Sequence, residues 1–286
     1  MEIAVYLPLL LPLLTVPAAR WLAPRCHPRA ATWGLLATAV VSAAGSTASL
    51  ALLTAAGLTR VTPVTAVAAL GLVAVLVAVV RTGSRHLRVL RDAYAEAELH
   101  PDSDLVVTRD ESPIAYALPG APGRVVVSTG MLAALNATER QVLLAHERAH
   151  LADRHHLFLA AVTLAAAANP LVRPLRTAVA YTVERWADET AADRVGDRRS
   201  TARAVGKAAL ATRRTVAGHP AALHATAGPV PRRVSALLDA PPAGRGSRFR
   251  AVLLATAALL ALVVVSSLDA ADDLHDLFET TGITAR

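Results

Sequence analysis

The sequence predicts a mainly α-helical membrane protein with about four transmembrane helices and one α+β domain between the third and the fourth. Hydrophobic residues make up 54% of the 286 residues, against 18% charged and 3% aromatic residues. An ordinary soluble core does not need so many apolar residues. They form long Leu, Val and Ala runs that are flanked by arginines, as membrane spans are.

Four apolar segments are long enough to cross about 30 Å of hydrocarbon as helices. In chain order they are Ile3–Ala19, a stretch within Ala30–Thr59, Val61–Val80 and Ala251–Leu268. The charged residue before the first segment is Glu2, and without a basic start we expect a retained helix and not a cleaved signal peptide. The predicted organisation is three spans in residues 1–82, a domain in 83–248, a fourth span in 249–268 and a short tail in 269–286.

The distribution of arginines predicts the orientation, because positive flanks favour the cytoplasmic side. Most arginines near the spans lie in the loop between the first and second spans, directly after the third span or directly before the fourth. They are Arg20, Arg25, Arg29, Arg81, Arg85, Arg88, Arg91, Arg245, Arg248 and Arg250. The loop between the second and third spans carries only Arg60, and the tail opens with acidic residues. We therefore expect a multi-pass plasma-membrane protein whose domain faces the cytoplasm and whose tail at 269–286 is extracytoplasmic.

The net charge of +7 does not indicate a nucleic-acid-binding protein. Many of the basic residues are arginines beside the predicted spans, where they contact anionic lipid, and they are not interleaved with aromatic residues. We expect the lipid bilayer as a partner, and no nucleic acid. Cys26 is the single cysteine of the chain, which excludes a disulfide scaffold.

Short apolar runs separated by turn residues predict strands early in the domain. They are expected at Leu105–Thr108, Ile114–Leu118 and Arg124–Ser128, after a helix over Leu87–Leu99 that continues the third span. A helix then begins at Asn136, where Glu139 completes a capping box, and continues through the following motif towards His156. Another helix contains Tyr181–Val195 and stops at Gly196. Residues 199–247 also look helical, and no chemistry is assigned to them.

His146, Glu147 and His150 form an HExxH sequence on the helix that begins at Asn136. The i, i+4 spacing places both imidazoles on one face, close enough to bind one zinc ion. Glu147 beside the metal could accept a proton from zinc-bound water and pass it to a leaving amine. The alternative is a solvated helix face with two histidines and a surface glutamate, but the preceding apolar residues 142–145 indicate a partly buried helix.

A catalytic zinc site needs a third protein ligand and an open position. Downstream, Glu184 and Asp188 are two carboxylates at helical spacing; one could bind the metal while the other accepts a hydrogen bond from a ligand histidine. The residue types alone do not rank Glu184 above Asp188, Glu189 or His155. The apolar run Leu157–Val172 is short for a span, and we expect it to be a buried or membrane-dipping helix, because a full span would separate Glu184 from His150.

The sequences HERAH at 146–150, NPLV at 169–172 and ERWADE at 184–189 resemble membrane-bound zinc metallopeptidases of the gluzincin type. The chain is similar to the peptidases related to beta-lactam-sensing antirepressors and, more distantly, to the CAAX prenyl proteases and the heat-shock membrane proteases. The resemblance implies a zincin-like α+β domain. The stretch ALPGAPGRVVVSTGML at 117–132 resembles the strand and turn that precede the motif helix in these enzymes, and by analogy that strand would offer an edge to an extended substrate. The resemblance further implies that His146, His150 and Glu184 bind one zinc ion per chain, that Glu147 is the general base and that Asp188 supports the site.

The resemblance implies a metalloendopeptidase that acts on a protein or peptide, with a cytoplasmic transcriptional repressor as the analogous substrate. Antirepressors carry a penicillin-binding domain after their last span, and since the sequence ends at Arg286 we do not expect drug sensing. A residue that stabilises the oxyanion is expected among Tyr181, His219, His224 and nearby arginines, whereas His155 and His156 are interpreted as interfacial or structural. The alternative function is a non-catalytic zinc-binding membrane signalling or scaffold protein.

Overall fold

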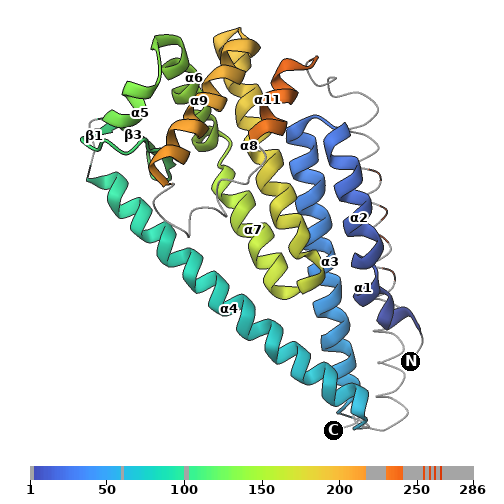
Figure 1. Cartoon of the computed structure of the whole chain (residues 1–286). Coiled ribbons are helices and arrows are strands. Elements are labelled where there is room, and N and C mark those ends of the chain that lie inside the picture. The colour runs from blue at the N-terminus through green and yellow to red at the C-terminus, as the bar shows by residue number, and fades with distance from the viewer. Residues whose placement is uncertain are drawn as a thin grey trace. The chain divides into compact units, whose positions relative to one another are not determined.

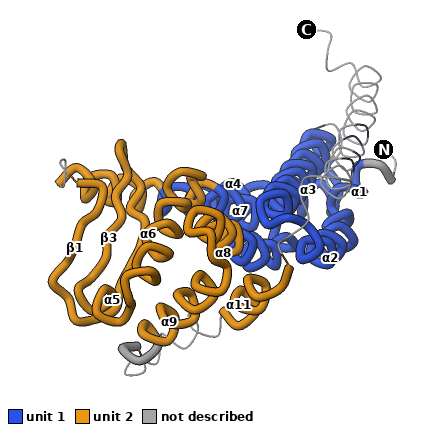
Figure 2. The backbone as a smooth tube through the Cα atoms, turned by 90° about the horizontal axis from the view of Figure 1, so that it is seen from above, with its two compact units in different colours: residues 1–86, 158–182, 243–286 blue, residues 87–157, 183–242 orange. Residues whose placement is uncertain are grey.

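The computed structural model describes residues 3–58, 61–99, 103–216 and 230–240, and beyond them only Leu254, Ala258, Ala261 and Val265. The described chain is mostly helical and forms two compact units (Figure 2). Unit 1 comprises residues 1–86, 158–182 and 243–286, and unit 2 comprises residues 87–157 and 183–242. The predicted fourth span and the tail lie almost entirely outside the described residues, so they stay predictions.

The predicted first span is not one uninterrupted helix in the structure. It consists of short helical pieces: the 3-10 helix η1 (Ile3–Tyr6), α1 (Leu7–Leu10), α2 (Pro12–Leu22) and the 3-10 helix η2 (Ala23–Arg25). Prolines at positions 8, 12 and 17 have no N–H to donate, which interrupts the backbone hydrogen bonding of a helix. None of these pieces has the length of a span.

Two described helices, α3 (Pro28–Ala56) and α4 (Pro63–Glu98), are long and apolar enough to cross a membrane, by length and composition. The apolar window of α3 is 44% buried, and its buried face is rich in Ala, Ser and Thr, which allow close approach of other helices in the unit. In α4 only 11% of the window is buried. The predicted helix over Leu87–Leu99 is confirmed as the continuation of α4 (Figure 1).

The rest of unit 1 comes from α7 (His155–Ala168), the 3-10 helix η3 (Pro170–Val172) and the first part of α8 (Arg173–Val195). Two hydrogen bonds join this segment to α3. The Asn169 amide donates to Ser46 Oγ at 2.8 Å, and the Thr32 hydroxyl donates to Thr182 Oγ1 at 2.9 Å. Residues 158–182 therefore pack with the long apolar helix of their unit, and their depth in a membrane stays a prediction.

Unit 2 begins with the last part of α4, from Leu87. A three-stranded sheet in the order β1-β3-β2 follows, formed by β1 (Leu105–Thr108), β2 (Ala115–Leu118) and β3 (Arg124–Ser128). The predicted strands are confirmed to within one residue. β3 is buried along its length and pairs parallel with β1 and antiparallel with β2. Within the described sheet, β2 therefore pairs along one side only.

The sheet is followed by α5 (Thr129–Ala134), α6 (Ala137–Ala152), α9 (Arg198–Val216) and α11 (Val230–Leu238), together with the second part of α8. The capping box is confirmed, with both hydrogen bonds between Asn136 and Glu139 at 2.9 Å. The predicted stop of α8 is also confirmed, since Gly196 adopts φ +74°, where glycine is favoured. Residues 217–229 and 241–247 of the predicted helical region lie outside the described residues.

The prediction that the helix of the HExxH motif continues towards His156 is wrong. The helix α6 ends at Ala152, and Arg154 has φ +51°, a left-handed conformation that stops a right-handed helix. A new helix, α7, starts at His155. The sequence carries no Gly, Pro or Asn at this turn, so the usual signals of a helix end are missing.

Candidate metal centre

Helices α6 and α8 bring three potential metal ligands together in unit 2. Among the described residues, His146, His150 and Glu184 form a group whose donor atoms all lie within 4.8 Å of one another. The Nε2 atoms of the two histidines are 3.1 Å apart. The Glu184 carboxylate lies 3.7 Å from Nε2 of His146 and 3.5 Å from Nε2 of His150.

This donor set fits a zinc ion. Two imidazole nitrogens and one carboxylate oxygen are a frequent ligand set of catalytic zinc, with bonds of about 2.0–2.2 Å. Tetrahedral geometry with such bonds separates neighbouring donor atoms by about 3.3 Å. The two imidazole nitrogens are 3.1 Å apart, and the nearest Glu184 oxygen lies 3.7 Å from His146 Nε2 (Oε2) and 3.5 Å from His150 Nε2 (Oε1). One donor atom from each residue lies within 4.8 Å of the others, so the three residues could hold one zinc ion after an adjustment of the Glu184 side chain.

Asp188 lies one helical turn beyond Glu184 and contacts the opposite nitrogen of His146. Its Oδ1 is 3.1 Å from His146 Nδ1, and its side chain is only 2% exposed. The sequence left open which carboxylate would face the metal. In the structure Glu184 lies with the Nε2 atoms, and Asp188 lies behind His146.

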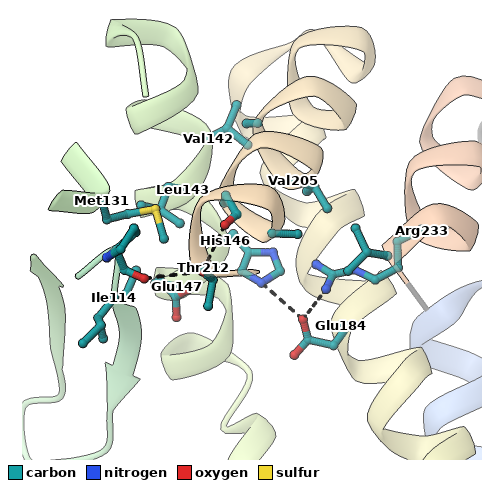
Figure 3. A pocket seen from close by; sticks show the side chains of 16 residues that line it. Ile114, Met131, Val142, Leu143, His146, Glu147, Glu184, Val205, Thr212 and Arg233 are labelled. Carbon is teal, nitrogen blue, oxygen red and sulfur yellow. Dashed lines mark hydrogen bonds and ion pairs between the residues drawn. The ribbon is translucent and has the colours of Figure 1, made fainter. Parts of the chain in front are cut away.

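Arg233 on α11 connects both carboxylates, and sequence reasoning did not single it out. Its Nε and Nη2 donate to the two oxygens of Asp188 at 2.7 Å each, and its Nη1 lies 2.7 Å from Glu184 Oε2. Figure 3 shows both His146 and Arg233 directed at Glu184. No motif marks this arginine, because it lies 45 residues after Asp188.

These contacts decide the protonation of the metal-free site. Burial by itself lowers the pKa of His146, but the hydrogen bonds and charges of Asp188 and Glu184 outweigh burial and raise it to about 10. Burial and the neighbouring charge of His146 lower the pKa of His150 to about 4. Burial opposes ionisation of Glu184 and Asp188, yet His146 and Arg233 hold the pKa of each below its usual range. Both carboxylates are thus ionised and available as acceptors.

Glu147 is buried at 9% exposure beside the three potential ligands. Burial raises the pKa of its carboxyl group, and the backbone N–H of Ala117 on β2 donates a hydrogen bond to it. A surface glutamate on a solvated helix face would have neither property. Glu147 thus lies next to both β2 and the histidines, where a carboxylate could exchange a proton with a bound ligand.

A pocket with a volume of about 340 Å³ opens beside His146, Glu147 and Glu184. Its wall is mainly apolar and comes from β2 and the two residues before it, α5, α6, α8, α9 and α11. Figure 3 shows Ile114, Met131 and Leu143 on the side away from Arg233. Short side chains on α9, Ala204, Ala208 and Ala209, contribute to the space. The pocket could receive an apolar side chain next to the reacting groups.

The remaining candidates from the sequence are not in the group of potential metal ligands, or they lie outside the described residues. His155 is buried, and its Nδ1 lies 3.0 Å from Nδ1 of His150, the ring nitrogen that faces away from the other potential ligands. Glu189 pairs with Arg198. Tyr181 belongs to unit 1. His219 and His224 lie outside the described residues.

Residues 79–167 match the model of peptidase family M48, a family of zinc metallopeptidases. The match supports the interpretation of this chain as a zinc metallopeptidase. It includes β1–β3 and the motif residues His146, Glu147 and His150, and it ends before Glu184 and Asp188. No curated protein and no solved structure matches the chain. The finer relation to antirepressor or CAAX peptidases therefore rests on the motifs alone.

Proposed function

We propose that this chain is an integral-membrane, zinc-dependent metalloendopeptidase in which Glu147 is the general base. The observation that carries the proposal is the convergence of His146, His150 and Glu184 next to the buried Glu147. A site that binds zinc only to hold the fold needs no such carboxylate, and it needs no adjoining pocket. Both features favour the enzyme over the scaffold.

The residues have distinct roles in this proposal. His146, His150 and Glu184 would hold one zinc ion, which when bound polarises the scissile carbonyl and makes a water acidic. Glu147 accepts the proton of the attacking water and returns it to the departing nitrogen. Asp188 holds His146 by its Nδ1, and Arg233 balances the charge of both carboxylates.

The substrate would bind as an extended chain along β2. This strand pairs only with β3 among the described strands, and an unpaired strand edge offers backbone donors and acceptors to a peptide. Binding there places the peptide over Glu147, because Ala117 of β2 donates to the Glu147 carboxylate. The adjoining pocket would then hold one apolar side chain of the substrate.

The proposed location is supported by α3 and α4, which are long and apolar enough to cross a membrane, and by the arginines after the apolar part of α4. Arg81, Arg85, Arg88 and Arg91 favour the cytoplasmic side for unit 2. We propose a multi-pass protein of the plasma membrane whose peptidase domain acts on a cytoplasmic protein, with a transcriptional regulator as the substrate by analogy to the antirepressors.

The test combines metal content and cleavage on the detergent-purified full chain. Elemental analysis should find one zinc per chain in the parent and in Glu147→Gln, and much less in Glu184→Ala. Cleavage of a peptide library should be abolished in Glu147→Gln. Arg148→Gln, which changes the next residue in the motif, is the control and should cleave like the parent. If the parent binds zinc but cleaves no peptide of the library and no protein of a membrane extract, the scaffold function is favoured. If the parent binds no zinc, the metal site is refuted.

A further inference from the structure

The two histidines of the HExxH motif have different partners on their outer nitrogens. Both Nε2 atoms lie with the other donors of the metal group. Nδ1 of His146 meets a carboxylate oxygen of Asp188 at 3.1 Å, whereas Nδ1 of His150 meets Nδ1 of His155 at 3.0 Å. One ligand histidine is therefore supported by a carboxylate and the other by an imidazole.

We propose that His155 is a positioning residue for metal binding, whose Nδ1 accepts a hydrogen bond from Nδ1–H of His150 and so presents the lone pair of His150 Nε2 to the metal. The inference rests on the proposed zinc site and adds a third histidine, which lies behind His150. It assigns to His155 a task that the motif itself does not contain.

Tautomer chemistry explains why His150 needs such a partner. A neutral imidazole carries one proton, and the nitrogen that binds a metal carries none, so the proton of His150 must be on Nδ1. A donor that is buried without an acceptor destabilises the folded state. An acceptor at Nδ1 spares His150 this cost, selects the tautomer that binds metal and fixes the ring plane. To accept at its own Nδ1, His155 must carry its proton on Nε2.

The fold holds His155 in this position from two sides. It is the first residue of α7, 1% exposed, directly after the left-handed turn at Arg154 that ends the motif helix. Its ring packs edge-on against Trp186, with ring centroids 4.6 Å apart. Trp186 lies on α8 between Glu184 and Asp188. The same turn of α8 thus supplies a potential metal ligand, the partner of His146 and the support of His155.

The test uses a matched pair of variants, His155→Asn and His155→Leu, in the detergent-purified full chain. Asparagine and leucine have the same shape, but only asparagine offers an acceptor close to the place of Nδ1. Zinc affinity is measured by competition with a chromophoric chelator, which requires no substrate. Loss of a hydrogen-bond partner of a metal ligand typically weakens metal binding 10–100-fold. We expect this loss in His155→Leu and recovery of most of the affinity in His155→Asn. His156→Gln, one position further, is the control and should bind zinc like the parent.

A purely structural role for His155 predicts another pattern. Both variants would then lower the unfolding temperature of the metal-free protein, and zinc affinity would fall with that temperature whether or not the new side chain has an acceptor. Equal affinity of His155→Leu and parent, or equally weak binding of both variants, overturns the inference while the zinc site stands. If His155→Leu does not fold, His155→Phe, which keeps a ring against Trp186, takes its place with the same expectation. A parent chain that binds no zinc overturns both the inference and the proposed function.

Discussion

The Arg233 guanidinium donates to both carboxylate oxygens of Asp188, each at 2.7 Å, from a helix that begins 42 residues after Asp188. Both side chains are largely buried, with 11% and 2% of their surfaces exposed. The pair joins α11 to α8 at the point where Asp188 contacts His146. The helix α11 thereby contacts two carboxylates of the candidate metal centre.

Replacing Arg233 by methionine should destabilise the metal-free protein by about 3 kcal/mol or more. Removing one partner leaves Asp188 as a buried charge without its bidentate donor, and breaking such pairs costs about 3–5 kcal/mol. Chemical denaturation in detergent measures the change. Arg232→Met, at the exposed neighbouring position, is the control and should change stability by less than about 0.5 kcal/mol.

The double variant Arg233→Met with Asp188→Asn separates charge from packing. It removes both charges, so it should be more stable than Arg233→Met alone. A double variant that is as unstable as the sum of the two single variants would show that the pair is not coupled.

Removal of zinc should lower the unfolding temperature of the parent chain. A ligand that binds only the folded state stabilises it by about 2.7 kcal/mol at a free concentration 100 times its Kd. Thermal unfolding before and after chelation, and again after zinc is added back, measures this difference. In His146→Ala, chelation should not change the unfolding temperature, because His150 and Glu184 alone leave the group with two of its three metal donors. The same shift in His146→Ala as in the parent would place zinc elsewhere in the chain.

Filling the pocket beside Glu147 should impair cleavage without releasing zinc. Ala208 of α9 lines the pocket and is not among the potential ligands. Ala208→Leu adds bulk to the space that would hold an apolar substrate side chain, so we expect kcat/KM to fall at least about tenfold, the usual scale for losing a well-filled apolar contact. Zinc content, from elemental analysis, should be unchanged.

The exposed Leu210 on the same helix provides the control for this prediction. Leu210→Phe adds a similar bulk away from the pocket and should cleave like the parent. For peptides with a small residue in place of the large apolar one, Ala208→Leu and the parent should have the same kcat/KM. If Ala208→Leu cleaves all peptides at the parental rate, the pocket does not receive the substrate.

Local sequence patterns were sufficient for several elements of the site. The capping box of Asn136 and Glu139, the strand limits and the spacing of His146 and His150 depend on residues within a few positions of one another. Such patterns can be recognised because helix and strand geometry alone converts spacing into proximity. The break at Arg154 could not, since an exposed arginine in a left-handed conformation has no characteristic sequence signal.

By itself, the sequence determined the helix that carries His146, Glu147 and His150, its start, and the apolar helices that precede it. The motif resemblance also implied Glu184 and Asp188, but only the tertiary structure decided how the partners are arranged. Glu184 lies at the Nε2 atoms, Asp188 and His155 lie at the Nδ1 atoms, and Arg233 contacts both carboxylates. The physical reason is that these contacts join separate helices. Their geometry depends on how α6, α7, α8 and α11 pack, and no spacing along the chain encodes that packing.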